Sequence, residues 1–510
     1  MIAANANPIP DQPGDYVIKS DEGDAVPSTN LLASTRGVIA SLEAGPAFKG
    51  AAQDEFEQKI RRLERATLDV PVAQRAFRNR TYGALRNYSI SAAIPTIGEK
   101  TTFKIPGSAQ PCTNFTSLTA TVQYISTRAI IYTDDASPPG GFTSTDFQQI
   151  GDEFDALIYP TGVAYFGTPI DLDNNGRVVI LYTPEVNKLT PANNPGGFVG
   201  GFFFAGDLFP SSGVNSCPQS NVAELFYLLS PDPDGTINGN KRSTASVRQG
   251  TRGTIAHEFQ HMINASETIR STIKHEFESV WLNEALSHLI EEATGRVLKG
   301  IGPAENADFA RLSSNINDFN AYFFQNFARF RGYLQAPGVN PPTSAEAESS
   351  LAVRGAAWAF LRYTADHYSP NGNERELTRA LVVGPDTGVV NLVKRTNAPF
   401  DTLLAGWMVA NYADDLGIPG LAQKYTYRSY NIRSNVAAIT TPSRTYPLVV
   451  NQIGTGSYVS PTLQAKSGTG NYFQFARPAG AQARTFRFLN PDGRTTASFT
   501  GATLYILRSQ

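Results

Sequence analysis

Histidine is scarce in this 510-residue chain, yet four of its five histidines fall between residues 257 and 288. The first two stand in the stretch HEFQH, residues 257 to 261, which is an HExxH motif. On a helix, residues i and i+4 lie on one face, one turn apart. Two imidazoles in that arrangement bind one metal ion, and the intervening glutamate is placed to accept a proton from a water molecule. We therefore expect His257 and His261 to be metal ligands and Glu258 to be a general base.

A second predicted helix, VWLNEALSHLIEEATG, covers residues 280 to 295. Its Glu284 and His288 are again i and i+4, so they share one face. A catalytic zinc ion usually takes three protein ligands and leaves one position for water. The third ligand is expected from this helix. His275, between the two helices, lacks a second histidine four residues later and is interpreted as non-catalytic.

These motifs resemble those of a known group of enzymes. HEFQH followed by WLNEALSH resembles the gluzincin metallopeptidases, which include thermolysin. The longer pattern GTIAHEFQHMINAS…VWLNEALSHLIEE looks most like the hyicolysin family of secreted bacterial peptidases, over roughly residues 100 to 430. The resemblance implies that His257, His261 and Glu284 bind one zinc ion and that Glu258 is the base.

One position departs from the thermolysin-like pattern. Four residues after the ligand glutamate those enzymes carry an aspartate, and this chain has His288. We interpret His288 as a residue that hydrogen-bonds a ligand, and direct coordination of the metal is the alternative.

The expected activity is that of a zinc endopeptidase acting on proteins or peptides through a metal-activated water. A zinc aminopeptidase is one alternative, and a non-enzymatic surface or adhesion protein that retains the scaffold is another. The stretch GGFVGGFFFAG, residues 196 to 206, is either an edge strand that pairs with substrate backbone or a buried core strand. An additional hydrogen-bond donor should stabilise the oxyanion, and its candidates are Tyr322, Tyr333, Tyr363 and His367.

A second ion is predicted at DLDNNG, residues 171 to 176. Asp171, Asp173 and Asn175 match the first three ligand positions of an EF-hand-type calcium loop. Position 12 of such a loop would be Tyr182 in place of the usual glutamate. The alternative is a turn that leads into the following strand.

Composition and cysteine content limit the kinds of binding partner and the cell compartment to be expected for this protein. Lys and Arg number 43 and Asp and Glu number 45, which argues against a nucleic-acid partner. No apolar run approaches the roughly 18 residues of a transmembrane helix. The start, MIAANANPIPDQPG, does not read as a signal peptide. A disulfide between Cys112 and Cys217 is nevertheless expected, and with the family resemblance it favours a secreted monomer.

The predicted fold class is α+β, in three parts. Residues 1 to 96 would form an N-terminal arm (1 to 30) and a helical segment, and could be a pro-segment. Residues 97 to 436 would form the zinc metallopeptidase domain, with a β-containing N-terminal lobe and a helical C-terminal lobe. Residues 437 to 510 contain strand-like stretches separated by turns and would form an all-β domain.

Overall fold

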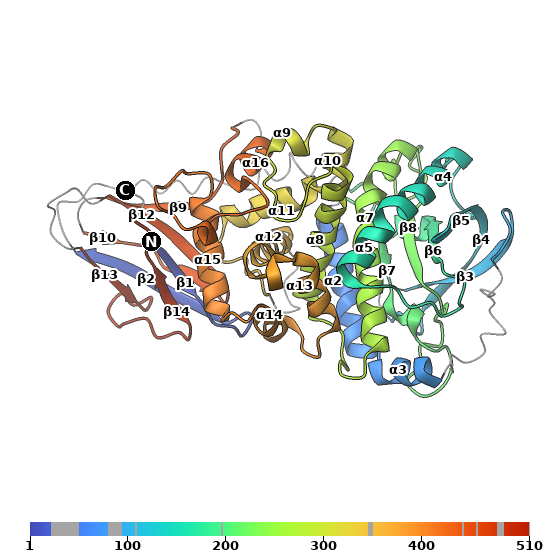
Figure 1. The fold of residues 1–510 in the computed structure, drawn as a ribbon, viewed down its shortest axis with the longest axis horizontal. Helices are drawn as coiled ribbons and strands as arrows, with labels where there is room; N and C mark the ends of the chain where they lie inside the picture. Colours follow the sequence, from blue (N-terminus) through green and yellow to red (C-terminus); the bar gives the residue numbers. More distant parts are fainter. Residues whose placement is uncertain are drawn as a thin grey trace.

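The chain is an α+β protein whose three regions follow one another along its long axis (Figure 1). A six-stranded sheet lies at one end, a helical region in the middle and two small sheets at the other end. The computed structural model describes residues 1–21, 50–79, 94–107, 110–194, 197–344, 350–440, 443–454, 457–476 and 484–508.

The large sheet has the strand order β3-β4-β5-β6-β8-β7. Its inner strands β5, β6 and β8 run parallel, and β6 and β8 are buried along their whole length. Continuous apolar runs are typical of strands covered on both faces. β7 is the edge strand and pairs antiparallel with β8. The strand bounds are β3 (Lys100–Pro106), β4 (Phe115–Ile125), β5 (Ala129–Asp134), β6 (Val178–Thr183), β7 (Gly201–Phe203) and β8 (Leu225–Leu229).

Two long helices pack together between this sheet and the rest of the helical region. They are α7 (Thr244–Arg270), which contains the HExxH motif, and α8 (Val280–Leu298). The Ser243 hydroxyl caps α7 by accepting a hydrogen bond from the backbone of Ser246. Residues 253 to 266 are all buried, so this part of α7 is enclosed on every side.

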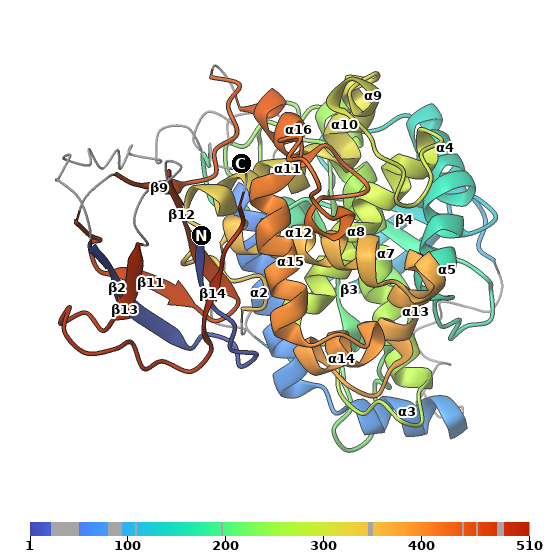
Figure 2. The same ribbon diagram turned by 60° about the vertical axis from the view of Figure 1, so that its left-hand side comes forward.

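The remaining helices cover the sheet or form the central region, in an arrangement that Figure 2 shows from a second side. Their bounds are α2 (Gly50–Thr67), α3 (Val70–Asn79), α4 (Ser144–Glu153), η1 (Phe154–Ile158), α5 (Tyr159–Phe166), α6 (Pro184–Asn187), η2 (Ala205–Leu208), α9 (Phe309–Leu312), α10 (Ile316–Tyr322), α11 (Phe324–Gln335), α12 (Leu351–Tyr368), η3 (Pro370–Gly372), α13 (Glu374–Val383), α14 (Gly388–Thr396), α15 (Phe400–Ala413), η4 (Gln423–Tyr425) and α16 (Ile432–Ile439).

The two C-terminal sheets are built around strands from the N-terminus. β1 (Ile2–Asn5) lies between β12 and β14, and β2 (Pro13–Asp21) pairs with β10, β11 and β13. The C-terminal strands are β9 (Val450–Ile453), β10 (Tyr458–Val459), β11 (Leu463–Lys466), β12 (Thr469–Phe475), β13 (Thr485–Leu489) and β14 (Ala502–Tyr505).

The prediction of an N-terminal arm is therefore wrong for residues 2 to 21. The stretch is rich in Pro, Asp and Asn, but it alternates apolar and polar residues well enough to bury Tyr16 and Ile18 completely. Its partners lie more than 430 residues away in the sequence. Residues 22 to 30 of that predicted arm lie outside the described residues.

The predicted disulfide is confirmed, because Cys112 and Cys217 are bonded. It closes a loop across a sequence separation of 105 residues, between the segment after β3 and the segment before β8. In the part of the chain that the structure describes, no helix combines the length and the apolar character needed to cross a bilayer.

Candidate metal centre

Helices α7 and α8 bring three ligand side chains of the predicted zinc site together. The Nε2 atom of His257 lies 3.3 Å from Oε2 of Glu284, and Nε2 of His261 lies 3.6 Å from Oε1. Ligand atoms bound tetrahedrally at about 2.0–2.1 Å from one zinc ion stand roughly 3.3 Å apart. All three side chains are buried, with exposed fractions of 2% or less. The donor set therefore fits a zinc ion in both atom type and spacing.

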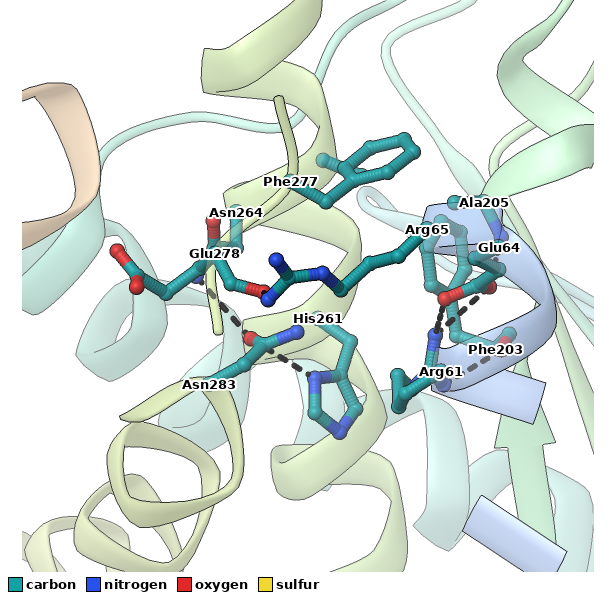
Figure 3. Close-up of a pocket in the computed structure, with 11 residues that line it drawn as sticks. Arg61, Glu64, Arg65, Phe203, Ala205, His261, Asn264, Phe277, Glu278 and Asn283 are labelled. Carbon is teal, nitrogen blue, oxygen red and sulfur yellow. Dashed lines mark hydrogen bonds and ion pairs between the residues drawn. The ribbon is translucent and has the colours of Figure 1, made fainter. Parts of the chain in front are cut away.

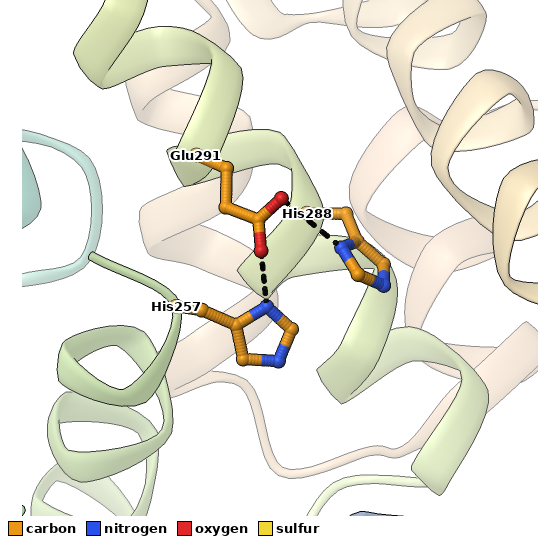
Figure 4. A group of neighbouring side chains, drawn as sticks. All are labelled: His257, His288 and Glu291. Carbon is orange, nitrogen blue, oxygen red and sulfur yellow. Dashed lines mark hydrogen bonds and ion pairs between the residues drawn. The ribbon is translucent and has the colours of Figure 1, made fainter. Parts of the chain in front are cut away.

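The other ring nitrogen of each histidine faces an oxygen acceptor. Nδ1 of His257 lies 2.8 Å from Oε1 of Glu291, as Figure 4 shows, and Nδ1 of His261 lies 3.1 Å from Oδ1 of Asn283. An acceptor at Nδ1 requires that Nδ1 carry the proton, which leaves the lone pair of Nε2 for a metal. Both acceptors come from α8, so the helix that carries the predicted ligand Glu284 also orients the two histidines.

The two histidines are held in the neutral form that binds metals. Burial lowers the pKa of His257 below its ordinary value of 6.5. Burial, and then the positive charge of Arg61, lower the pKa of His261 further. A neutral imidazole offers a lone pair, whereas an imidazolium ion does not. The environment therefore favours metal binding at neutral pH.

His288 lies behind His257, away from the Nε2 atoms. Its ring centroid is 4.9 Å from that of His257, and its Nδ1 atom lies 3.4 Å from Oε2 of Glu291 (Figure 4). This position leaves Glu291 as the direct hydrogen-bond partner of His257, with His288 against the second oxygen of the same carboxylate. Glu291 was not singled out from the sequence, although it lies seven residues, or two helical turns, after Glu284.

Glu258 lies at the boundary between α7 and the edge strand β7. Its carboxylate is fully buried, and Oε2 accepts a hydrogen bond of 2.9 Å from the backbone N–H of Phe203. Arg61 of α2 places Nη2 3.6 Å from the same oxygen. A cation and an N–H donor both favour the ionised carboxylate, which is the form that can accept a proton.

Helix α2 contributes side chains that sequence analysis did not connect with the site. Besides Arg61, it places Oε1 of Glu57 3.6 Å from Nε2 of His257. Glu57, His257 and Glu258 also form a compact group of possible metal ligands. The available signal was the spacing of Gln53, Glu57 and Arg61 at intervals of four residues on one face of a charged helix.

A buried arginine reaches the centre from α12. Arg354 Nη1 forms an ion pair with Oε2 of Glu284, and its Nη2 atom has no hydrogen-bond partner among the described residues. The guanidinium thus places a cation beside the carboxylate predicted to be a ligand. Nothing in the local sequence around Arg354 marks it for this position.

Three of the four side chains predicted to stabilise an oxyanion donate hydrogen bonds elsewhere, and the fourth, Tyr333, packs among buried aromatic rings. The hydroxyl of Tyr322 donates to Glu153, and that of Tyr363 donates to the carbonyl of Lys424. Tyr333 packs against Phe330 and Trp407, and Nε2 of His367 donates to the carbonyl of Thr426. His275 likewise lies apart from the centre, with Nδ1 3.2 Å from Oε1 of Gln74.

The predicted calcium loop brings together Asp171, Asp173 and a third carboxylate, Glu224, which the sequence analysis missed. Asn175 lies against this group, since its Nδ2 donates a hydrogen bond of 2.6 Å to Oδ2 of Asp173 and its Oδ1 accepts one from the backbone N–H of Arg177. The carboxylate of Asp171 accepts backbone N–H groups of residues 175 and 176, as in an ordinary turn. Calcium binding here stays a prediction.

Comparison with known proteins yields one informative similarity. No protein-family model matches the chain. The neutral metalloprotease ShpI of Staphylococcus hyicus is 33% identical over 145 residues, which is 28% of this chain and 30% of that protein. The chain therefore matches less than a third of the relative's length. The similarity supports a metalloprotease family, suggests a metal-dependent protease and implies a metal ion.

Proposed function

We propose that this protein is a zinc-dependent endopeptidase of the hyicolysin type, within the gluzincin group. The observation that carries the proposal is the meeting of His257 Nε2, His261 Nε2 and the Glu284 carboxylate at separations of 3.3 and 3.6 Å. In this proposal those three residues hold one zinc ion, and the partial similarity to a neutral metalloprotease supports the assignment.

Bound zinc would lower the pKa of a water molecule towards about 7 and polarise the carbonyl of the peptide bond to be cleaved. In the proposal Glu258 accepts the proton of the attacking water, and Arg61, 3.6 Å away, is the cation that faces its carboxylate. It then donates that proton to the amine that leaves. Glu291 and Asn283 keep the two histidine rings oriented throughout.

The disulfide supports a proposed extracellular location. Cys112 and Cys217 are joined across 105 residues, and such bonds persist mainly in oxidising compartments. A secreted endopeptidase would meet folded or partly folded proteins as substrates.

Metal analysis combined with a peptidase assay tests the proposal. We expect about one zinc ion per chain, loss of most of it in His261→Ala, and casein hydrolysis, slow in the parent and faster in the α2 variants described below, that a chelator abolishes and added zinc restores. Equal hydrolysis of peptides with blocked and free amino termini would distinguish an endopeptidase from an aminopeptidase. Zinc binding without chelator-sensitive hydrolysis, in the parent and in the α2 variants described below, would favour the non-enzymatic alternative.

A further inference from the structure

Helix α2 carries a row of polar side chains that is buried instead of solvated. Gln53, Glu57, Arg61 and Glu64 are spaced by four, four and three residues, so they lie on one face of the helix. Their exposed fractions are 1%, 2%, 3% and 4%. A charged face normally remains in water unless each group finds a partner. The partners of this face are the metal centre and the edge strand β7.

Gln53 binds the β7 edge through its side-chain amide. Its Oε1 accepts a hydrogen bond of 2.6 Å from the N–H of Gly200, and its Nε2 donates one of 2.8 Å to the carbonyl of Gly201. A primary amide has the same donor and acceptor pair as a peptide group. Gln53 therefore binds the edge strand as the backbone of a neighbouring strand would.

Two further side chains extend this contact along the chain, as Figure 3 shows. Nη2 of Arg61 donates a hydrogen bond of 2.7 Å to the carbonyl of Phe203, and Oε1 of Glu64 accepts one of 2.7 Å from the N–H of Ala205. Exposed N–H and C=O groups of an edge strand are the groups to which an extended peptide adds by β-augmentation. Side chains of α2 occupy two carbonyl groups of β7 and the N–H groups of Gly200 and Ala205 on either side of it, next to the proposed base Glu258.

Glu57 lies beside the proposed metal site. Its Oε1 is 3.6 Å from His257 Nε2. It forms a compact group with His257, a proposed ligand, and Glu258, the proposed base. A catalytic zinc ion needs one position for water. The buried Glu57 carboxylate takes up space between a proposed ligand and the base, where that water would have to lie.

The remaining contacts of α2 leave little space beside His261. Asp54 of the same helix forms an ion pair of 2.9 Å with Arg329 of α11, and both side chains are 2% exposed. The pocket that Arg61 and Phe203 line on one side and His261 and Asn283 on the other has a cavity volume of only about 10 Å³ (Figure 3). That is roughly the space for the centre of one water molecule.

We propose that helix α2 keeps the protein latent by occupying the substrate site from within the chain. Its polar face takes the place of an extended peptide on β7, and Glu57 takes up space between His257 and Glu258 that the attacking water requires. Displacement of α2 exposes both. That α2 occupies the substrate site is inferred from the contacts of α2. That this occupancy keeps the enzyme latent rests on the proposed peptidase function.

Calorimetry of a peptide hydroxamate binding to the zinc-loaded protein tests whether α2 occupies the substrate site, and it does not rely on hydrolysis. If less than a tenth of the molecules have α2 displaced, freeing the site should strengthen hydroxamate binding by at least about tenfold. We expect that gain in Gln53→Ala and in Glu57→Ala. Lys59→Ala, on the exposed face of the same helix, should bind like the parent. Equal affinities in all four proteins would overturn the proposal.

Hydrogen exchange on the unmodified protein provides a second measurement that needs no folded variant. A saturating hydroxamate should speed the exchange of amides in residues 50 to 67 and leave those of α7 protected. Unchanged protection of α2 with hydroxamate bound would overturn the proposal.

The peptidase assay separates the two proposals. Chelator-sensitive hydrolysis that rises in Gln53→Ala and Glu57→Ala supports both. Hydrolysis at the same rate in the parent and both variants contradicts latency and keeps the peptidase. Stronger hydroxamate binding with no hydrolysis in any of these proteins supports occupancy by α2 and contradicts the peptidase.

Discussion

Glu258 and Glu284 are both fully buried carboxylates, but their surroundings give them different chemistry. Glu284 faces the Nε2 atoms of both motif histidines, which is the position of a ligand. Glu258 faces a backbone N–H and the Arg61 guanidinium, and no contact places it between the two histidines as Glu284 is placed. One residue is therefore suited to hold a metal ion, and the other to exchange a proton.

The two glutamates should respond differently to the same substitution. Glu258→Gln keeps the shape and removes proton acceptance, so zinc content should remain near that of the parent while hydrolysis falls by about 10²–10⁴-fold. Glu284→Gln should lose zinc and activity together, because a neutral amide is a poor zinc ligand. Zinc analysis and peptidase assays on both variants check this. Loss of zinc in Glu258→Gln with full retention in Glu284→Gln would reverse the assignments.

Arg354 is a candidate hydrogen-bond donor for the oxyanion that the sequence analysis did not predict. Its guanidinium lies against Glu284, whereas the hydroxyl of Tyr363 is bonded to the carbonyl of Lys424. We expect Arg354→Ala, at saturating zinc, to lower kcat by about 10²–10³-fold, the usual loss for one oxyanion donor. Tyr363→Phe should keep kcat within a few fold. A variant Arg354→Ala with full zinc content and unchanged kcat would exclude this role.

At the scale of secondary structure, the sequence could predict those strands and helix faces that the local spacing of residues determines. The stretch AIIYTD, residues 129 to 134, is an apolar run with turn residues on both sides, a pattern that favours a strand, and it forms β5. The approach of His257, His261 and Glu284 follows from i, i+4 geometry on two adjacent helices. Glu57 and Arg354 come from helices distant in the sequence, and no spacing rule connects them with the HExxH motif.

The proposed role of helix α8 in orienting His257 of α7 can be tested. Glu291 of α8 accepts the Nδ1 proton of His257, which raises the basicity of the ring and directs Nε2 to the metal. Glu291→Gln should weaken zinc affinity by about 10–100-fold, measured by competition with a chromogenic chelator. Glu267→Gln, a carboxylate near the end of α7 that pairs with Arg270, is the matched control and should not change it. Equal zinc affinities of the two variants would contradict the role of Glu291.

For the whole molecule, the most consequential feature is that both chain ends form one structure. β1 and β2 lie inside the two C-terminal sheets, and between them and α7 the chain passes through α2 at the metal centre. Removal of residues 1 to 96 as a pro-segment would take away both N-terminal strands and α2. Displacement of α2 alone, with β1 and β2 kept in place, leaves the C-terminal sheets complete.

The N-terminal strands should therefore govern the stability of the other end of the chain. Ile18 is fully buried in a small core with Tyr16, Ile453 and Phe473, apart from the main core. Ile18→Ala should lower the free energy of unfolding of this region by about 2–5 kcal/mol, from lost burial and the cavity left behind. Hydrogen exchange should quicken in residues 484 to 508, which contain the partner strand β13, and remain slow in α7 and α8.

Ile9→Ala, at a side chain that is 62% exposed, is the matched control and should change the unfolding free energy by less than about 0.5 kcal/mol. If Ile18→Ala leaves exchange in residues 484 to 508 as slow as in the Ile9→Ala control, β2 does not hold these sheets together.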